Sequence, residues 1–178
     1  MGQAKLENKK KIGILGGTFD PAHIGHIKIS ITAKKIFKLD KVIWAITIKN
    51  PYKKNTSLNL KKRISYAKKI SLKNKFIKIG FYEDKIKSNK TINLIKFFIK
   101  KNENTEIYFI MGADNLINFH KWEKYNLIPG LCKILVFDRD GYKSKSLKSL
   151  SFKKYNNKSL EFIKFKKVKI SSSQLRKI

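Results

Sequence analysis

The sequence predicts an α/β protein built around a doubly wound parallel sheet. Three observations point to this class: apolar strand-like runs alternate with amphipathic helical segments, a double glycine follows the first run, and the 178 residues suffice for one sizeable core. We expect a single domain over residues 11–178, preceded by a disordered leader over residues 1–10. Ligands of such sheets bind beyond the carboxyl ends of the strands, so a site is expected in the loops that follow them.

Each expected strand is a short run rich in Ile, Val and Phe, and each expected helix has apolar residues at helical spacing. The strands are expected at residues 12–15, 41–47, 76–82, 106–111, 132–137 and 160–165. The apolar stripes of the helices are expected to be Ile24, Ile27 and Ile31; Leu60, Ile64 and Ala67; and Ile92, Ile95, Phe98 and Ile99. Residues 138–157 are polar and are expected to be irregular, whereas residues 171–176 are expected to form a capped helical turn.

The composition is strongly basic. The chain has 42 Lys and Arg against 12 Asp and Glu, which gives a formal charge of +30. Such a charge is typical of nucleic-acid-binding proteins, but lysine is here mixed with Ile and Asn throughout, and only Arg63, Arg139 and Arg176 are arginines. We interpret the excess as a compositional bias toward solvated lysine. Its field still attracts phosphorylated substrates.

The cysteine content and the hydropathy pattern exclude other classes. Cys132 is the single cysteine, so an internal disulfide and a thiolate zinc cluster are excluded, and a buried position in a strand is expected. Apolar runs stay well short of a transmembrane helix, and residues 1–11 lack the apolar core of a secretory signal. We therefore expect a cytoplasmic protein with no membrane partner.

Residues 12–27 carry the most specific pattern of the chain. An apolar run ends at the double glycine Gly16-Gly17, and a turn at Asp20-Pro21 leads into an amphipathic segment. This order predicts a strand, a tight loop and the N-terminus of a helix. Main-chain N–H groups and the helix dipole favour an anion at such a junction, and glycine leaves room for a phosphate.

Two histidines, His23 and His26, stand where this helix is expected to begin. If the helix starts near Ile24, both imidazoles can face one ligand from adjacent turns. A lone histidine at such a place is more often a cap or a surface residue, but the preceding loop favours a role for both. A zinc site is disfavoured because no cysteine or carboxylate stands at ligand spacing nearby.

The string from Gly16 to His26, GGTFDPAHIGH, resembles the signature of the H-x-G-H nucleotidylyltransferases, and within them the bacterial nicotinate-nucleotide adenylyltransferases. The resemblance covers essentially residues 11–178 and implies a Rossmann-like nucleotidylyltransferase fold. It implies that His26 stabilises charge at the α-phosphate of ATP and that His23 places the triphosphate. Thr18 and Phe19 would then contribute main-chain N–H groups to phosphate binding.

The C-terminal string from Ile170 to Arg176, ISSSQLR, is similar to the I-S-S-T-x-I-R pattern of the same family. Serine hydroxyls at the start of a helix, together with an arginine fork, suit a polyphosphate. Ser172, Ser173 and Arg176 are therefore candidate nucleotide-binding residues. The family commonly continues into a further helix, whereas this chain stops two residues after Arg176.

The acceptor-binding residues are also implied by the resemblance. Gly112-Ala-Asp114 followed by Trp122 resembles a family segment in which the aspartate binds a ribose and the tryptophan stacks on the pyridine ring. Lys53 and Thr91 match two further family positions. Lys90 and Asn93 depart from the Tyr and Asp usual on either side of the second position.

The expected activity is transfer of the adenylyl group of ATP to nicotinate mononucleotide, which gives nicotinate adenine dinucleotide and pyrophosphate in NAD biosynthesis. Mg²⁺ is expected to arrive with ATP, without a protein metal site. The alternatives are a sibling enzyme that uses nicotinamide mononucleotide or phosphopantetheine, a basic nucleic-acid-binding protein, and a nucleotide sensor without turnover. No specific nucleic-acid partner is expected, and the oligomeric state is left open, with a homodimer as one option.

Overall fold

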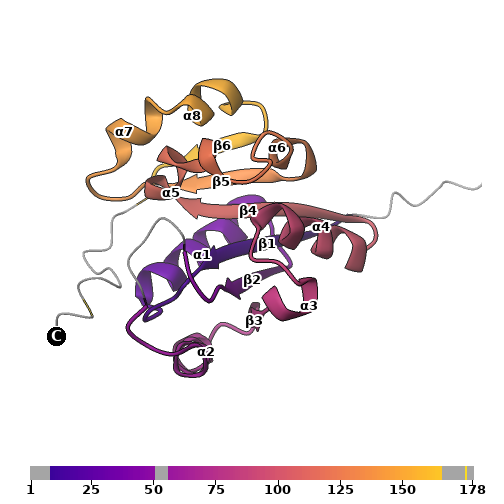
Figure 1. Ribbon diagram of the computed structural model, residues 1–178, viewed down its shortest axis with the longest axis vertical. Helices are drawn as coiled ribbons and strands as arrows, with labels where there is room; N and C mark the ends of the chain where they lie inside the picture. Colours follow the sequence, from indigo (N-terminus) through magenta and orange to yellow (C-terminus); the bar gives the residue numbers. More distant parts are fainter. Residues whose placement is uncertain (1–8, 51–55, 166–174, 176–178) are drawn as a thin grey trace, which may run out of the picture.

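The computed structural model describes residues 9–50, 56–165 and 175 of the chain. Its six strands are β1 (Lys10–Gly17), β2 (Lys41–Ile46), β3 (Ile77–Phe81), β4 (Thr105–Gly112), β5 (Lys133–Phe137) and β6 (Leu160–Ile163). They form one sheet in the order β3-β2-β1-β4-β5-β6, in which every neighbouring pair is parallel. Figure 1 shows them stacked in this order from β3 at the bottom to β6 at the top. The predicted doubly wound parallel sheet is confirmed.

The helices of the described residues cover both faces of this sheet. They are α1 (Ile24–Phe37), α2 (Leu60–Ser71), α3 (Glu83–Ile86), α4 (Thr91–Lys101), α5 (Ala113–Ile117), the 3-10 helix η1 (Phe119–Lys121), α6 (Ile128–Leu131), α7 (Lys143–Leu147) and α8 (Leu150–Tyr155). Buried side chains of α1 and α2 pack on one face, and those of α4, α5, η1, α6 and α8 pack on the other. Two apolar cores therefore enclose the sheet.

Alternation along the strands sorts side chains between the two cores. In β1, Ile14 belongs to the core under α4, and the next residue, Leu15, belongs to the core under α1. In β4, Phe109 faces the α4 side, whereas Tyr108 and Ile110 face the α1 side. Because both faces are covered, these strands are continuous apolar runs, which is why their positions are readable in the sequence.

The strand order fixes where a ligand can bind. β1 lies between β2 and β4, so the chain winds outward in opposite directions from the β1–β4 pair. In doubly wound sheets the crevice beyond the carboxyl ends of such a pair is the usual ligand site. Gly17 ends β1 and Gly112 ends β4, so the loops after these two residues border the crevice.

The predicted apolar stripe of α1 is wrong in two of its three members. Ile27 is buried, but Ile24 and Ile31 are 46% and 42% exposed. The other buried residues of the helix are small: Gly25, Ser30 and Ala33. Such residues bring the helix axis close to the sheet, so the buried side is defined by small side chains that a search for large apolar residues misses.

Residues 138–157 were expected to be irregular, and this prediction is wrong. The segment contains α7 and α8, which bury Ser146, Ser151 and Tyr155. Ser149 caps α8 by accepting a hydrogen bond from the N–H of Phe152 at 3.2 Å, and the Ser146 hydroxyl donates to the carbonyl of Lys143 at 2.8 Å. A capping serine and one buried hydroxyl satisfied by the main chain, that of Ser146, help to explain why a polar stretch is helical here.

Cys132 is buried, as predicted, but it lies between α6 and β5 rather than in the strand, which begins at the next residue. Burial raises the pKa of its thiol to about 12, so it stays protonated and inert at neutral pH. Within the described ranges, none of the helices is both long enough and apolar enough to cross a bilayer. Lys10, which the sequence analysis placed in the leader, is the first residue of β1.

Candidate active site

A pocket of about 150 Å³ opens at the carboxyl end of the sheet. Its floor is made by Gly16 and Gly17 of β1, Ala45 and Ile46 of β2, and Phe109 of β4. Its rim comes from the segments that follow β2, β3 and β4. The Gly16-Gly17 loop and the segment after Gly112 therefore meet here, as the topology predicted, whereas Pro51 and Ser171 lie outside the described residues.

The two glycines of the floor are not required by the packing of the protein itself. A Cβ added at Gly16 would lie 3.6 Å from Phe109, and one added at Gly17 would lie 3.5 Å from Phe19, both ordinary contacts. Gly13, earlier in the same strand, differs because a Cβ there would lie 2.9 Å from Leu39 Cδ1. Both glycines line the pocket, and the space at Gly16 adjoins Phe109 of its floor, where a ligand could approach the main chain closely.

His23 and His26 cap the first turn of α1 reciprocally. His23 is the N-cap residue, and its Nδ1 accepts from the N–H of Gly25 at 3.1 Å. Nδ1 of His26 accepts from the N–H of His23, also at 3.1 Å. An Nδ1 that accepts a hydrogen bond carries no proton, so each neutral ring bears its proton on Nε2 and can donate from that atom.

The His26 ring lies next to the aromatic rings of Phe19 and Trp44. Phe19 lies 4.7 Å from His26 and stacks on the indole of Trp44 at 5.0 Å, both measured between ring centroids. The buried Trp44 Nε1 donates to Ser30 Oγ at 2.8 Å, and that hydroxyl donates to the carbonyl of His26 at 2.8 Å. Phe19 and Trp44 together thus fix the position of the second histidine.

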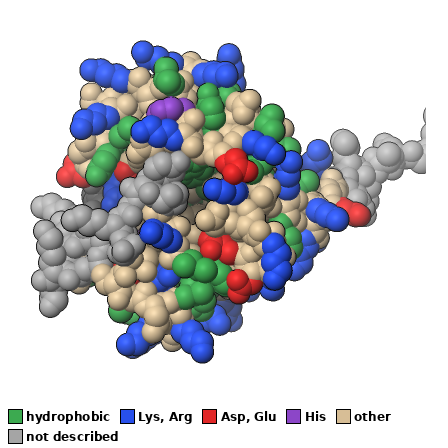
Figure 2. All heavy atoms as spheres, viewed as in Figure 1, with side chains coloured by type: hydrophobic (Ala, Val, Ile, Leu, Met, Phe, Trp, Pro, Cys, Tyr) green, Lys and Arg blue, Asp and Glu red, His purple; other side chains and the backbone are tan. Residues whose placement is uncertain are grey.

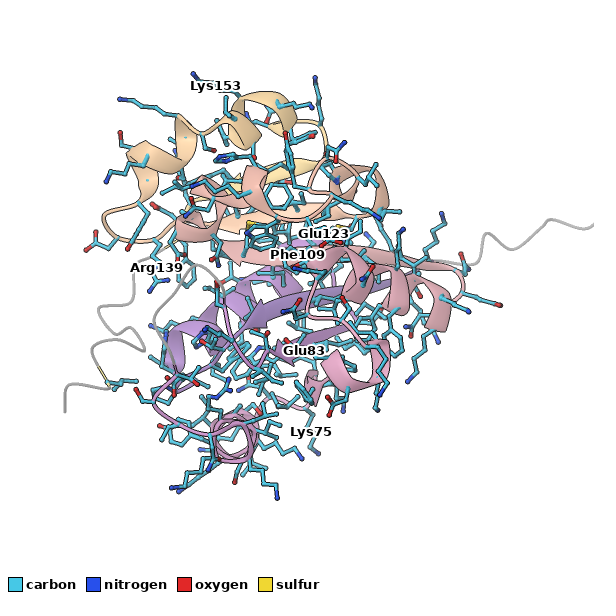
Figure 3. All side chains as sticks on the ribbon, viewed as in Figure 1. Lys75, Glu83, Phe109, Glu123, Arg139 and Lys153 are labelled. Carbon is cyan, nitrogen blue, oxygen red and sulfur yellow. The ribbon has the colours of Figure 1, made fainter. Side chains whose placement is uncertain are left out.

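An ion pair stands beside the first histidine. Arg139 Nη1 lies 2.7 Å from Asp114 Oδ2, and the Asp114 side chain is only 9% exposed. The pKa of His23 is lowered to about 4, first by burial and then by the positive charge of Arg139. His23 is therefore neutral at physiological pH, and the positive charge beside it belongs to Arg139. Figure 3 shows Arg139 on the same side of the sheet as the strand carboxyl ends.

Arg63 of α2 holds the surrounding loops together. Its side chain is 1% exposed, and its guanidinium donates to the carbonyls of Thr18 at 2.6 Å, Thr47 at 2.8 Å and Ile48 at 3.1 Å, while Nε donates to Leu58 at 3.0 Å. Burial lowers the pKa of Arg63, and the carboxylates of Asp20 and Glu83 oppose this shift. One cation thus joins the loop after β1 to the segment after β2.

Asp20 also links the loop after β1 to the segment that precedes α2. Its carboxylate is buried and accepts from the N–H groups of Ser57 at 2.6 Å and Leu58 at 2.9 Å. The sequence analysis assigned Asp20 a turn only, and the structure adds this link to the segment before α2. Phe19 has a left-handed backbone, with φ of 48°, and its ring belongs to the core. Main-chain donation from Thr18 and Phe19 to a phosphate stays a prediction.

The predicted acceptor residues divide into two groups. Thr91, the first residue of α4, and Trp122 line the pocket, whereas Asp114 does not, and the next residue, Asn115, does. Trp122 meets Phe109 and Phe119 edge-to-face, with centroid distances of 6.0 and 5.3 Å. Its ring is therefore held in one orientation at the pocket wall.

Tyr82 and Glu83 complete the opposite wall and were missed by the sequence analysis. Glu83 accepts from the Thr47 hydroxyl and from the N–H of Ile48, at 3.3 Å for the latter. Burial raises the pKa of Tyr82, so its hydroxyl remains a donor. Figure 3 shows Glu83 on the β2–β3 side of the pocket, and Glu123 with Phe109 on the β4 side.

Lys53, Ser172, Ser173 and Arg176 lie outside the described residues. Among the residues that are described, His, Cys, Asp and Glu side chains do not gather in threes at a spacing that would hold a metal ion. Figure 2 shows Lys and Arg spread over the whole visible face rather than gathered in one stripe. This distribution matches the interpretation of the charge as a compositional bias.

The fold and the histidine pair define a nucleotidylyltransferase of the cytidylyltransferase-like family, whose family model matches residues 14–178. The chain is 62% identical over 172 residues to a probable nicotinate-nucleotide adenylyltransferase of Pelagibacter ubique, covering 97% of this chain and 95% of that one. It is 36% identical over 173 residues to the protein of the same name from Clostridium botulinum, covering 94% and 85%. The chain belongs to the nicotinate-nucleotide adenylyltransferases.

A solved structure has the same fold. It is a Plasmodium falciparum nicotinic acid mononucleotide adenylyltransferase complexed with NaAD, which matches with a TM-score of 0.73 at 20% identity and covers 94% of this chain and 83% of that one. The predicted Rossmann-like nucleotidylyltransferase fold is thereby confirmed.

Proposed function

We infer that this chain transfers the adenylyl group of ATP to nicotinate mononucleotide, giving nicotinate adenine dinucleotide and pyrophosphate in NAD biosynthesis. The observation that carries the assignment is the reciprocal His23–His26 cap of the helix that follows the Gly16-Gly17 loop; the two glycines line a pocket that reaches Trp122, whereas the two imidazoles do not line it. Family membership and the relatives' names support the same reaction. The nucleic-acid-binding alternative gains no support, since basic side chains are dispersed on the visible face.

The chemistry needs no covalent intermediate on the protein. A phosphate oxygen of the mononucleotide attacks the α-phosphorus of ATP in line, a new P–O bond forms, and the bond to the bridging oxygen of the β-phosphate breaks, releasing pyrophosphate. Negative charge accumulates on the α-phosphate oxygens and the leaving group. Mg²⁺ enters with ATP as part of the substrate and neutralises part of this charge.

The protein supplies fixed hydrogen-bond donors for that charge. We assign Nε2–H of His26 to the α-phosphate, because its Nδ1 is held by the His23 amide and its ring is held by Phe19. Donors that are already oriented cost no reorganisation during the reaction, which makes them effective for catalysis. His23, with Arg139 beside it, is assigned to the triphosphate.

Gly16 and Gly17 border the phosphate end of the pocket, and Trp122 with Thr91 borders the acceptor end. We assign the pyridine ring to the face of Trp122, whose orientation is fixed by Phe109 and Phe119. A ribose contact for Asp114 is also proposed, although one of its oxygens is already paired with Arg139. The roles of Lys53, Ser172, Ser173 and Arg176, the cytoplasmic location and the oligomeric state stay predictions.

The deciding experiment measures pyrophosphate release from Mg-ATP with three acceptors offered separately: nicotinate mononucleotide, nicotinamide mononucleotide and phosphopantetheine. We expect turnover with nicotinate mononucleotide to exceed that with either other acceptor. Preference for another acceptor would overturn the substrate and leave the histidine roles in place. Absence of turnover with all three would overturn the assignment as an enzyme of this class.

A further inference from the structure

Trp44 and Ser30 connect the sheet to the main chain of His26 inside the core. Trp44 belongs to β2 and Ser30 to α1, and both residues are 0% exposed. Trp44 Nε1 donates to Ser30 Oγ, and Ser30 Oγ donates to the His26 carbonyl, each at 2.8 Å. An indole N–H group can only donate, so the serine oxygen accepts from it and turns its own proton toward the carbonyl. The direction of both hydrogen bonds is thereby fixed.

The indole of Trp44 also holds the imidazole of His26. The ring of Phe19 stacks on the indole with centroids 5.0 Å apart and an interplanar angle of 20°, and the same ring lies 4.7 Å from the imidazole. The indole itself lies 5.8 Å from the imidazole, measured between ring centroids. One side chain of the sheet therefore reaches both the main chain and the ring of His26.

The strand that carries Trp44 also carries part of the pocket floor. Trp44 pairs with Leu15 where β2 lies beside β1, and the next pair along these strands is Ala45 with Gly16. Ala45 and Gly16 both line the pocket. The hydrogen bonds of Trp44 and Ser30 therefore tie His26 to the two strands beside which we propose phosphate binding.

The helix cap alone does not supply this link. The cap joins His26 to His23 within the first turn of α1, so it orients the ring relative to the helix. Apolar contacts between a helix and a sheet have no direction, so they restrain the position of the helix less precisely than a hydrogen bond does. The bond from Trp44 to Ser30 supplies that direction and fixes the first turn of α1 relative to β2.

We propose that Ser30 and Trp44 are positioning residues for adenylyl transfer and that they act through His26. The proposal rests on the function inferred above and deepens it. Neither residue lines the pocket, so we expect neither to touch a substrate. Together they hold Nε2 of His26 where the charge on the α-phosphate develops. A misplacement of about 1 Å at a reacting group costs up to about a hundredfold in rate, so loss of this link lowers kcat rather than the affinity for ATP.

The first test removes the hydroxyl of Ser30. Ser30→Ala should lower kcat by about ten- to a hundredfold and change KM for ATP by less than about twofold. The matched control is Ser71→Ala, because Ser71 is also a buried helical serine whose hydroxyl donates to a carbonyl, that of Lys68, at 3.2 Å. Ser71→Ala should keep the kcat of the wild type, even where its Tm falls as far. An unchanged kcat in Ser30→Ala would overturn the proposal.

The second test removes the other partner. Trp44→Phe keeps an aromatic ring against Phe19 but lacks the indole N–H, and it gives the same comparison of kcat with KM where Ser30→Ala does not fold. Because the link needs both partners, the double variant of Ser30→Ala and Trp44→Phe should lose no more kcat than the more affected single variant. Losses that multiply in the double variant would show two independent effects and would overturn the proposal.

The last test asks whether the link acts through His26. In a His26→Ala background the imidazole is already absent, so adding Ser30→Ala should change the residual kcat by less than about twofold. A further loss of about tenfold in that background would show that Ser30 acts elsewhere, which would overturn the proposal and leave the adenylyltransferase assignment intact. A wild type that releases no pyrophosphate from Mg-ATP and nicotinate mononucleotide would instead overturn that assignment.

Discussion

Nδ1 of His26 lies 3.1 Å from the main-chain nitrogen of His23, so the second histidine is oriented by the backbone of the first. The same geometry that completes the helix cap also sets the tautomer of the ring, with the proton on Nε2. Helix capping uses Nδ1, which leaves Nε2 for the phosphate contact that we propose. A substitution at His26 acts on both, and the two effects can be separated.

Two substitutions of His26 separate its effect on helix capping from its proposed effect on activity. His26→Ala removes both the cap acceptor and the Nε2 donor, whereas His26→Gln keeps an acceptor that can reach back to the N–H of His23. We expect kcat to fall on the order of a hundred- to a thousandfold in both variants, because an oriented donor to the reacting phosphate is lost. Thermal unfolding should show a lower Tm mainly for His26→Ala, because only this variant loses the cap acceptor. Near-normal kcat in either variant would contradict the role assigned to His26.

The lowered pKa of His23 predicts an acid-sensitive stability. The unfolded chain binds a proton at the ordinary value of 6.5, while the folded protein does so only near pH 4. The unfolded state therefore holds more protons within this window, so the free energy of unfolding falls as pH decreases from 6.5 toward 4 and is unaffected by His23 above it.

The matched variant is His23→Asn, since Asn is a good N-cap that does not titrate. Urea unfolding at pH 7, 6 and 5 should show a shallower pH dependence in this variant than in the wild type. Identical slopes for the two proteins would show that His23 titrates alike in both states.

Two glycines of β1 should respond differently to the same change. Gly13→Ala brings a Cβ within 2.9 Å of Leu39 Cδ1 and 3.0 Å of Ile110 Cδ1, and overpacking of this kind costs roughly 1–3 kcal/mol. Gly16→Ala meets only ordinary contacts, so its Tm should stay close to that of the wild type. Its Cβ faces the pocket, and we expect KM for ATP to rise instead. A stable Gly16→Ala enzyme with unchanged KM values would argue against phosphate binding at this glycine.

Arg63 should govern the stability of the site loops. Arg63→Met leaves four main-chain carbonyls without the donor that satisfies them, which should lower the free energy of unfolding by about 3 kcal/mol or more. For a chain of this size the corresponding fall in Tm is roughly 6–12 °C. Arg63→Lys keeps the charge with fewer donors, so its Tm should lie between those of the wild type and Arg63→Met. A Tm of Arg63→Met equal to that of the wild type would contradict this role.

The sequence predicted the sheet well because its inner strands β2, β4 and β5 are buried on both faces and read as nearly unbroken apolar runs, while the edge strand β3 alternates apolar residues with Lys and Gly. It predicted α1 poorly, since the side of α1 that faces the sheet is made of Gly25, Ser30 and Ala33. The helices within residues 138–157 were missed because their buried side faces the core partly through Ser146 and Ser151, and serine in a sequence is typical of loops.

The local motif predicted candidate residues of the site, whereas residues that act through distant contacts were missed. Of the candidates, Gly16, Gly17, Thr91 and Trp122 line one pocket, and their roles there stay predictions. Arg63 and Arg139 were not assigned, although their rarity in a lysine-rich chain was a usable signal: only arginine offers several donors in a rigid fork. Trp44 and Ser30 gave no local signal, because their hydrogen bond exists only after α1 packs on β2.

The sequence by itself determined the class of fold and the order of strand, glycine loop and helix start at which we propose phosphate binding. Both follow from residues that are neighbours in the chain: apolar runs, a double glycine and two histidines three positions apart. The tertiary structure alone decided which nitrogen of each imidazole bears the proton, which cation joins the loops, and which charges line the pocket. These depend on hydrogen bonds and burial between segments tens of residues apart, and burial acts on a side chain only once the fold encloses it.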